Sequence, residues 1–349
     1  MKSKLPVGIV GYGAYVPRMR VRTQAISDVW RAKGAAAPAV AEKSVPGLDE
    51  DVVTMSIEAA RTALERAALE PDRIGALWVG TESKPYAVKP SATIVAEALG
   101  ITPHLVAADM EFACKAGSEA MQAAVAFVGS GLVEAAMAIG MDTAQAKPGD
   151  ALEYTAGCGG AAFVFGPAAD ALAIVEGSTS FVTDTPDFFR REHAPYPEHG
   201  GRFTGEPSYF HHTLRASRRL LEELGRKPAD YAQAVFHQPV PKFAERVADA
   251  LGFSAEQIDI GLVARQMGNA YAGSSLLGLA AVLDVVRAGE RIFFCSYGSG
   301  AGSDAFSFEV VKEAPIGFGG PKVQDYLARR REVEGYGQYL RLRRKIRTH

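Results

Sequence analysis

The sequence predicts an α/β protein, a five-layered α-β-α-β-α sandwich built from two duplicated halves. Strand-like and helix-like segments alternate, their order recurs along the chain, and two long helices carry small apolar residues on every face. Alternation of this kind favours mostly parallel sheets covered by helices, and a helix without a polar face belongs in a buried layer. With 349 residues and 48% hydrophobic composition, the chain can bury one large core or two closely packed halves.

The repeat is visible when the two halves are read side by side. In the first half, residues 1–170, the predicted elements are a strand at 7–17, a helix at 51–69, a strand at 74–83, a helix at 90–100, a helix at 114–132, and strands at 135–142 and 159–166. In the second half, residues 171–315, they are a strand at 171–185, a helix at 208–225, a strand at 231–240, helices at 241–252 and 269–286, and strands at 291–300 and 304–310. The pattern of PSATIVAEALG is echoed by PKFAERVADALG, so a duplication explains the order.

The helices at 114–132 and 269–286 are the ones expected in the central layer. Two long inserts break the symmetry, at residues 22–50 and 185–207. The second insert is rich in Pro, His, Arg and Gly, a composition typical of a functional loop.

Composition and charge argue against several function classes. The formal net charge of −2 predicts no general affinity for nucleic acid or for anionic membranes. No apolar stretch approaches the roughly 18 residues that span a bilayer, and no signal-peptide cleavage pattern follows the first lysines. The three cysteines, Cys114, Cys158 and Cys295, match no zinc spacing and cannot all pair with one another. We therefore expect a cytoplasmic protein.

Cys114 is the first candidate catalytic residue, because it lies where the helix at 114–132 begins. The positive end of a helix dipole stabilises a thiolate and lowers the thiol pKa from about 8.5. The first amides of the helix can also stabilise an oxyanion on a substrate carbonyl. A lone cysteine is equally common as a small buried side chain, so the repeat is needed to decide.

The repeat places three further polar residues at equivalent positions. Asn269 begins the other buried helix, close to the position that matches Cys114. Glu82 and His237 each follow a matching strand, at the edge where sheets of this type bind ligands. Taken singly, Glu82 could cap a helix and His237 could be structural. Together the four residues indicate an active site in which the two helix starts meet.

At these residues the chain resembles the thiolase superfamily and, within it, the 3-hydroxy-3-methylglutaryl-CoA synthases of the archaeal type. The resemblance covers nearly the whole chain. The motifs that carry it are GIVGYGAYVPR, TESKPYAVKPSATIVAEALG, DMEFACKAG, GDALEYTAG, FHQPVPK, MGNAYAGS and SYGSGAGSDAF.

The resemblance implies a role for each matching residue. Cys114 matches the cysteine that accepts the acetyl group, Glu82 the general base and His237 the catalytic histidine. The implied substrate and CoA contacts are Asn269 for the acetoacetyl group, Ser299 in the Gly-rich loop, Thr155, Arg202 and Thr204 for the acyl portion or CoA, and Lys242 and Arg246 for the CoA phosphates. Cys158 is a departure that the mechanism does not require, and its expected role is that of a small buried residue.

The implied reaction condenses acetyl-CoA with acetoacetyl-CoA and water to give 3-hydroxy-3-methylglutaryl-CoA and CoA, a step of the mevalonate route to isoprenoid precursors. Cys114 is acetylated first, Glu82 then removes a proton from the acetyl methyl group, and His237 meets the alkoxide that forms. The resemblance implies no metal or redox cofactor, since the CoA thioesters are substrates. It also implies a homodimer and a complex with an acetoacetyl-CoA thiolase held by a small bridging protein.

Three other readings share the fold. A ketoacyl synthase of the initiating type uses Cys, His and Asn but obtains its carbanion by decarboxylation, so it needs no base such as Glu82. A biosynthetic thiolase uses a second catalytic cysteine, whereas Cys295 falls inside a predicted strand. A non-catalytic scaffold is expected to lack Cys114, Glu82 or His237, and this chain has all three.

The carboxyl-terminal segment, residues 316–349, has a different composition. From Lys322 to His349 it contains nine Lys or Arg and three Asp or Glu, a net charge of +6, with tyrosines interleaved. This basic tail is interpreted either as a charged helix that closes the fold or as a docking surface for another protein, because Tyr and Arg are enriched in interfaces. Since it follows the last repeated strand, we expect the duplicated core to be complete without it.

Overall fold

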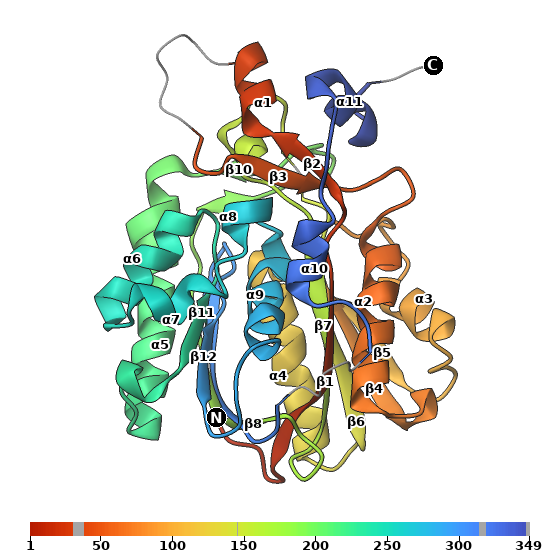
Figure 1. The fold of residues 1–349 in the computed structure, drawn as a ribbon, viewed down its shortest axis with the longest axis vertical. Helices are drawn as coiled ribbons and strands as arrows, with labels where there is room; N and C mark the ends of the chain where they lie inside the picture. Colours follow the sequence, from red (N-terminus) through yellow and green to blue (C-terminus); the bar gives the residue numbers. More distant parts are fainter. Residues whose placement is uncertain (31–37, 145, 314–318, 347–349) are drawn as a thin grey trace.

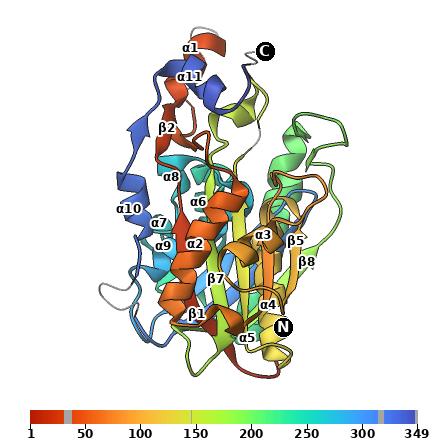
Figure 2. The ribbon, with the colours of Figure 1, turned by 90° about the vertical axis from the view of Figure 1, so that its right-hand side faces the viewer.

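The computed structural model describes residues 1–30, 38–144, 146–313 and 319–346 and shows the five layers that the sequence predicts. Figure 1 shows an outer helical layer on each side, a sheet inside each of these, and two helices at the centre. Figure 2, turned by 90°, shows a small region at one end of the molecule, above the layers, which contains α1 (Thr23–Trp30), β2 (Met19–Arg22) and α11 (Gly335–Leu342).

The first half contributes five adjacent strands of the sheet. In spatial order these are β5 (Val106–Met110), β4 (Ile74–Gly80), β6 (Ala135–Asp142), β7 (Gly159–Pro167) and β1 (Val7–Tyr15). The strand β4 pairs in parallel with β5 and β6, whereas β7 is antiparallel to β6 and β1. The carboxyl ends of β4 and β6 therefore meet at one edge, where Glu82 follows β4.

The second half contributes four strands to the same sheet. In spatial order these are β8 (Ala173–Val182), β13 (Gly302–Val310), β12 (Arg291–Cys295) and β11 (Gln233–Phe236). A short antiparallel pairing of β1 with β8, at Gly8–Ile174 and Ile9–Ala173, joins the halves into one nine-stranded sheet. The sheet folds back at this pairing, so its two parts lie on opposite sides of the central helices (Figure 1).

The expectation of mostly parallel strands is wrong. Only the β4–β5, β4–β6 and β11–β12 pairs of this sheet are parallel, and the other five are antiparallel. Each half ends in two strands that follow one another without an intervening helix longer than one turn. Strands connected in this way pair antiparallel, because a parallel pair needs a longer crossover.

The central layer consists of the two helices that the sequence assigned to it, α4 (Ala116–Gly129) and α9 (Ser274–Leu283). Every residue of α9 is buried. The helix starts approach so closely that a Cβ on Gly117 would lie 2.7 Å from the carbonyl oxygen of Ala272. Glycine is therefore required at position 117 for the two halves to meet at their helix starts.

The outer layers cover the two parts of the sheet. On the first half these are α2 (Val52–Ala67) and α3 (Ser91–Ala98), and on the second half α5 (His211–Leu224), α6 (Pro241–Leu251) and α7 (Ala255–Asp259). The short helix α8 (Ala264–Met267) contacts β3 (Glu42–Val45) instead. The strand β5, which the sequence did not predict, has no counterpart among the described residues of the second half, where α7 and α8 occupy the matching stretch. None of the helices described combines the length and the apolar composition needed to cross a bilayer.

The two inserts form separate small structures. Residues of the first insert form α1 (Thr23–Trp30) and β3 (Glu42–Val45), next to β2 (Met19–Arg22). The second insert contains the short hairpin of β9 (Phe188–Phe189) and β10 (Glu198–His199), which leads into the turn η4 (Gly201–Thr204) and the π-helical η5 (Gly205–Phe210).

The described part of the basic tail is built into the fold. It forms α10 (Val323–Ala328), β14 (Arg331–Glu332), which pairs with β2, and α11 (Gly335–Leu342). Val323, Tyr326 and Leu327 belong to the main hydrophobic core together with residues of α9. The expectation that the duplicated core is complete without this segment is therefore wrong for α10, because its apolar side covers the central layer.

Candidate active site

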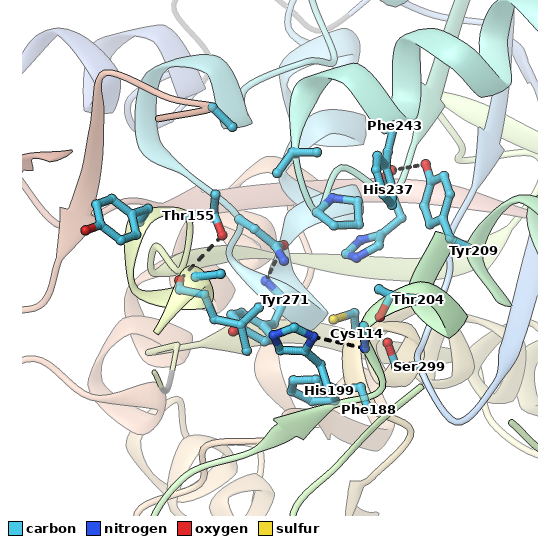
Figure 3. A pocket seen from close by; sticks show the side chains of 18 of the residues that line it. Cys114, Thr155, Phe188, His199, Thr204, Tyr209, His237, Phe243, Tyr271 and Ser299 are labelled. Atoms are coloured by element: carbon cyan, nitrogen blue, oxygen red, sulfur yellow. Dashed lines mark hydrogen bonds between the residues drawn. The ribbon is translucent and has the colours of Figure 1, made fainter. Parts of the chain in front are cut away.

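Cys114 lies in a strained turn at the start of a central helix. The turn η2 (Ala113–Lys115) leads directly into α4, and Ala113 adopts a φ of +41°. Left-handed backbone is unfavourable for a residue with a Cβ and is often found at functional sites. Cys114 is only 5% exposed, and its side chain reaches a cavity of about 600 Å³ (Figure 3). The turn therefore presents the thiol to this cavity.

Glu82 contacts Cys114 directly. The Cys114 thiol donates a hydrogen bond of 3.5 Å from Sγ to Oε1 of Glu82. Asp142, at the end of β6, holds the segment that carries Glu82: its Oδ1 accepts from the amide of Glu82 at 3.0 Å and from the hydroxyl groups of Thr81 and Ser83. Its Oδ2 accepts from the amide of Ala272, in the second half, at 2.8 Å. One carboxylate thus positions the glutamate and joins the halves.

The electrostatics of this group differ from the prediction of a thiol with a lowered pKa. Burial, followed by the charges of Glu82 and Asp142, raises the pKa of Cys114 well above its usual range. Burial and the nearby Asp142 also raise the pKa of Glu82, and burial raises that of Asp142 to about 6. Two carboxyl groups beside a buried thiol outweigh the dipole of α4. The negative charges of Glu82 and Asp142 therefore disfavour the thiolate form of Cys114.

His237 follows β11 and is almost completely buried, on the wall of the same cavity. Its amide donates to the carbonyl of Cys295 at 2.9 Å, and its own carbonyl accepts from the hydroxyl of Tyr209 (Figure 3). Burial lowers the pKa of His237 to about 3. Its buried Nδ1 has no hydrogen-bond partner in the described part of the chain. The imidazole is therefore neutral at physiological pH and retains a polar atom that can meet a ligand.

Asn269 is held just before the start of the other central helix. Its Oδ1 accepts from the amide of Tyr271 at 2.9 Å, and its backbone bonds to Thr155 and Gly157 of the first half. The turn η7 (Tyr271–Gly273) precedes α9 as η2 precedes α4, and Tyr271 has a φ of +49° where Ala113 has +41°. The structural counterpart of Cys114 is therefore Ala272, three residues after Asn269, so the sequence located this position closely but not to the residue.

The main cavity gathers most of the predicted residues. Cys114, His237 and Asn269 line it together with Thr155, Thr204 and Ser299. The second insert, expected to be a functional loop, contributes Phe188, His199, Gly201 and Thr204 to the wall. Apolar and aromatic side chains make up much of the remaining wall, among them Leu152, Tyr154, Tyr209, Phe243, Tyr271 and Tyr297. The oxygen Oγ1 of Thr204 is buried and, within the described residues, unpartnered.

Three predicted residues do not line this cavity, and a fourth, Arg202, cannot be placed relative to it from the described side chains. Glu82 touches Cys114 but lines a neighbouring cavity of about 190 Å³. Lys242 and Arg246 lie on α6 outside the cavity wall, and both are exposed. Arg246 pairs with Glu206 at 2.6 Å. The backbone of Arg202 lies in η4, and its side chain is outside the described part of the structure.

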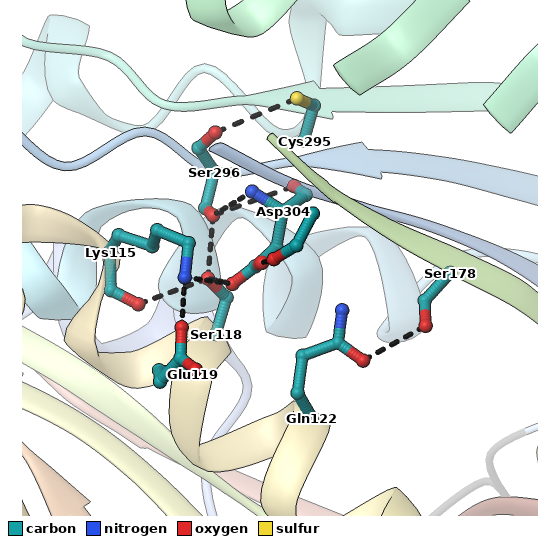
Figure 4. Close-up of polar contacts among 9 residues, drawn as sticks. Lys115, Ser118, Glu119, Gln122, Ser178, Cys295, Ser296 and Asp304 are labelled. Atoms are coloured by element: carbon teal, nitrogen blue, oxygen red, sulfur yellow. Dashed lines mark hydrogen bonds and ion pairs between the residues drawn. The ribbon is translucent and has the colours of Figure 1, made fainter. Parts of the chain in front are cut away.

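A buried polar network holds the turn η2, which carries Cys114, in place (Figure 4). The side chain of Lys115 is completely buried, with Nζ 3.1 Å from Oδ2 of Asp304 and in contact with Glu119. Ser118 donates to the same oxygen of Asp304 at 2.7 Å. Because Asp304 belongs to β13, this network ties the turn that carries Cys114, in the first half, to the strands of the second half. The lysine that follows Cys114 is therefore a structural anchor.

Neither of the other cysteines shares the environment of Cys114. Cys158 and Cys295 are buried, and neither lines the main cavity. Burial raises the pKa of each thiol to about 12. Cys295 is the last residue of β12, as the sequence predicted, and Cys158 packs beside Ser44, with which it shares hydrogen bonds. All three cysteines are unpaired.

Sequence reasoning missed three residues that shape the site: Asp142, Tyr209 and Phe188. A signal existed for Asp142, because it ends a strand at the same sheet edge as Glu82. Tyr209 and Phe188 lie in or beside the second insert, where no periodicity indicates which side chains turn inward. Their roles depend on how the insert folds over the cavity.

Comparison with known proteins agrees with this geometry. The family model for the amino-terminal part of hydroxymethylglutaryl-coenzyme A synthase matches residues 4–170, and the model for the carboxyl-terminal part of 3-oxoacyl-[acyl-carrier-protein] synthase III matches residues 221–310. A hydroxymethylglutaryl-CoA synthase of Pyrococcus furiosus is 57% identical over 348 residues, covering 99% of this chain and 98% of the relative. The chain belongs to the hydroxymethylglutaryl-CoA synthase family. A synthase of Methanocaldococcus jannaschii, 53% identical over 97% of this chain and 99% of its own, extends the family to methanogens.

Solved structures place the synthase family within a wider fold. MvaS in complex with 3-hydroxy-3-methylglutaryl coenzyme A has a TM-score of 0.84 at 25% identity, covering 98% of this chain and 92% of that one. A priming β-ketosynthase from the R1128 polyketide pathway has a TM-score of 0.81 at 20% identity, covering 90% and 99%, which shows the fold alone. Membership of the synthase family makes this chain an acyl-condensing transferase with a thiolase-like fold.

Proposed function

We propose that this chain condenses acetyl-CoA with acetoacetyl-CoA and water to 3-hydroxy-3-methylglutaryl-CoA and CoA, through an acetyl group carried on Cys114. Relatives that match over nearly their full length and are named hydroxymethylglutaryl-CoA synthase support the overall reaction. The mevalonate pathway is the known context of this reaction. The observation that carries the assignment of steps is the 3.5 Å contact between the Cys114 thiol and Glu82 at the wall of the main cavity. CoA thioesters are the substrates, and the proposal invokes no metal or redox cofactor.

In the first step, the sulfur of Cys114 attacks the carbonyl carbon of acetyl-CoA. The bond between the acetyl group and the CoA sulfur breaks, and CoA leaves with the proton that the thiol releases. Amides at the start of α4 are suited to stabilise the oxyanion on the carbonyl oxygen. Because burial and the charge of Glu82 raise the thiol pKa, the resting thiol is protonated, and the role proposed for Glu82 belongs to the second step.

In the second step, Glu82 removes a proton from the methyl group of the acetyl-enzyme. The contact with Cys114 places the carboxylate beside any group attached to sulfur. Burial and Asp142 raise the pKa of Glu82, which makes it a stronger base than an ordinary carboxylate. The enolate then attacks the ketone carbon of acetoacetyl-CoA. Decarboxylative condensation needs no such base, so the pairing favours proton abstraction over ketoacyl synthase chemistry.

The alkoxide formed in this step needs a hydrogen-bond donor. His237 is neutral, because its pKa is lowered to about 3, so it donates a hydrogen bond and is a poor source of a full positive charge. The proton that Glu82 has taken is the one that the alkoxide requires, so condensation consumes no net proton. Water then hydrolyses the thioester to Cys114, and the free thiol and the product result.

The substrate contacts proposed from the resemblance divide into two groups. Asn269, Thr155, Thr204 and Ser299 line the cavity, so they are suited to the acyl portions. The unpartnered Oγ1 of Thr204 supports a hydrogen bond to a ligand there. Lys242 and Arg246 lie on the helix that follows the cavity residues Pro239 and Val240, with exposed cationic ends. This position suits the CoA phosphates, and Arg202 is proposed as a further CoA contact.

We also propose that the protein is a cytoplasmic homodimer. The strand β5 forms one edge of the nine-stranded sheet, and Val106 at its start is about half exposed. An edge strand offers unpaired backbone groups to a second copy. Three unpaired cysteines agree with a reducing compartment. Size-exclusion chromatography with light scattering tests the dimer, and a monomeric mass contradicts it.

Association with an acetoacetyl-CoA thiolase through a small bridging protein remains a proposal about the tail. Tyr326 and Tyr339 are buried, so they offer no surface to a partner, whereas Arg329, Arg331 and Arg341 are exposed. Truncation removes core side chains and therefore tests stability as well as association. Arg329→Glu with Arg341→Glu reverses two exposed charges and removes no core side chain. We expect it to weaken co-purification with the thiolase and to leave isolated synthase activity intact, and unchanged co-purification contradicts the proposal.

The direct test of the proposed mechanism is incubation with acetyl-CoA alone, followed by intact-mass measurement and peptide mapping. We expect a mass increase of one acetyl group on the peptide that contains Cys114. Acetoacetyl-CoA added next should remove it with release of 3-hydroxy-3-methylglutaryl-CoA. Acetylation at another residue contradicts the nucleophile assignment, and condensation with malonyl-CoA in place of acetyl-CoA contradicts the reaction.

A further inference from the structure

Two cavities flank the Cys114–Glu82 pair. The larger, of about 600 Å³, is lined by Cys114. The smaller, of about 190 Å³, is lined by Glu82 and Ala113 together with Glu111, Phe189, Arg190 and Pro197. Because the thiol and the carboxylate are 3.5 Å apart, the two cavities lie next to one another at this pair.

Phe188 lines both cavities. It begins β9, where its backbone pairs with His199 of β10, another residue of the cavity wall. Its ring lies 6.2 Å from the ring of Tyr271, centroid to centroid, and it packs on the small hydrophobic cluster that contains Cys114. Figure 3 shows Phe188 on the same side of the cavity as Cys114. The hairpin and the tyrosine thus hold one aromatic ring between the two spaces.

The direction of the acyl group follows from the proposed mechanism, on which this inference rests. Glu82 must reach the methyl carbon of an acetyl group on Cys114, so the methyl points from sulfur towards Glu82. A longer acyl group adds its next carbon to that methyl. Where the acyl group continues in the same direction, the added carbon enters the region that Glu82, Ala113 and Phe188 enclose, on the side of the smaller cavity.

We propose that Phe188 sets the acyl-length specificity of the first step by closing the passage between the two cavities. With the ring in place, an acetyl group fits between Cys114 and Glu82 and a longer chain meets the ring. Without the ring, the chain continues into the smaller cavity. That space suits only a few extra carbons, since a water molecule occupies about 30 Å³ in the liquid and the cavity measures about 190 Å³.

The chemistry of the step does not change with chain length. The Cys114 sulfur forms the new thioester, the bond between the acyl group and the CoA sulfur breaks, and the thiol proton leaves with CoA. Acetyl-CoA, propionyl-CoA and butyryl-CoA therefore differ only in the space that the acyl group needs. Each methylene in a restrictive pocket changes discrimination by about tenfold or more.

The test compares acylation of Phe188→Ala, Phe188→Leu and the unchanged protein with these three thioesters. The rate of mass increase is measured for each, and peptide mapping identifies the residue modified. We expect Phe188→Ala to raise the rate with butyryl-CoA relative to acetyl-CoA by about tenfold or more, and Phe188→Leu to have a smaller effect in the same direction. Phe189→Ala is the matched control, since Phe189 lines only the smaller cavity, and we expect it to leave the ratio unchanged.

The outcomes separate this inference from the mechanism beneath it. Acetylation of the unchanged protein at a residue other than Cys114 overturns the proposed nucleophile, and the passage with it. Acetylation at Cys114 with the same acyl preference in both Phe188 variants overturns the passage alone. An equal change in Phe189→Ala also overturns it, because the effect then comes from loosening the hairpin. Thermal unfolding of each variant shows that the compared proteins are folded.

Discussion

The two halves share an order of elements but differ in the chemistry at their helix starts. In the first half, the strained turn before α4 carries Cys114, and Glu82 and Asp142 surround it with ionisable groups whose pKa values are raised. In the second half, the equivalent turn before α9 carries Ala272, and the nearby polar groups are neutral: His237, with its lowered pKa, and Asn269. In the proposed mechanism, the first half supplies the nucleophile and the base, and the second half supplies hydrogen bonds.

The difference shows how a duplicated fold supports a two-step reaction. Two like helix starts meet so closely that the amide of Ala272 bonds to Asp142 across the interface. If both halves carried charged groups here, each charge would shift the pKa values of the others at this short distance. A neutral second half lets the first half hold a base with a raised pKa. The following predictions test that division, beginning with the largest effect.

Replacing Cys114 by alanine removes the only covalent step of the first half. We expect Cys114→Ala to lose acetyl-enzyme formation and to reduce condensation by at least about 10⁴-fold, because no other group can hold the acetyl intermediate. The measurements are intact mass after acetyl-CoA and release of CoA. Cys158→Ala is the control and should retain acetylation. Normal turnover by a folded Cys114→Ala protein contradicts the assignment.

Replacing Glu82 should separate the two steps. We expect Glu82→Ala to acetylate Cys114 and to lose condensation by about 10²–10⁴-fold, the usual contribution of a general base. Loss of the carboxylate also removes a charge that raises the thiol pKa, which favours the thiolate that attacks acetyl-CoA. Single-turnover mass measurements before and after acetoacetyl-CoA distinguish the steps. A loss of acetylation as large as in Cys114→Ala would give Glu82 a different role.

Replacing His237 tests the neutral half. We expect His237→Asn to reduce condensation by about 10²–10³-fold, the effect of losing one donor to a developing oxyanion, with acetylation of Cys114 largely retained. The pH profiles of the variant and the unchanged enzyme should have the same acidic limb, since the imidazole is neutral above about pH 3. A limb near pH 6.5 in the unchanged enzyme that disappears in the variant would mean that the imidazolium takes part.

Asp142→Asn should shift a pH profile. Asp142 raises the pKa of Glu82, so we expect the acidic limb of condensation to move to lower pH in the variant. In the variant, the side-chain NH₂ group of the asparagine faces the N–H of Ala272, so a hydrogen bond is lost. This loss costs about 1–3 kcal/mol of stability. Asp284→Asn is a control, because Asp284 is a buried carboxyl group that bonds to Tyr12, away from the site. An acidic limb at the same pH in the variant and the unchanged enzyme contradicts the effect of Asp142 on the pKa of Glu82.

The smallest expected effect is on stability in acid. His237 has a pKa of about 3 when folded and about 6.5 when unfolded, so between these values the unfolded chain binds more protons. The free energy of unfolding should therefore fall as pH decreases from 6.5 towards 3, by up to roughly 1.4 kcal/mol per pH unit from this group. His237→Asn lacks this contribution. Urea unfolding at pH 7 and pH 5 measures the change in the free energy of unfolding with pH for each protein. An equal change in both proteins contradicts the prediction.

The amino-acid sequence alone determined the architecture and the reactive residue types. The repeat predicted the two halves and the central pair α4 and α9, because helices apolar on every face are stable only when buried. The matching positions of Cys114, Glu82 and His237 predicted that the three residues lie close together, and in the structure Cys114 contacts Glu82 and lines one cavity with His237. The strand β5 and the antiparallel pairings were missed, because short apolar runs do not reveal their partners.

Tertiary structure alone decided the electrostatics and the walls of the site. The sequence predicted a lowered thiol pKa from the helix start, whereas burial beside Glu82 and Asp142 raises it. That result depends on two loops from different strands reaching one point, which no local pattern encodes. The same holds for Phe188 and for the buried tyrosines of the tail: their positions follow from what the folded insert and α10 pack against, and packing partners far apart in sequence are set only when the chain has folded.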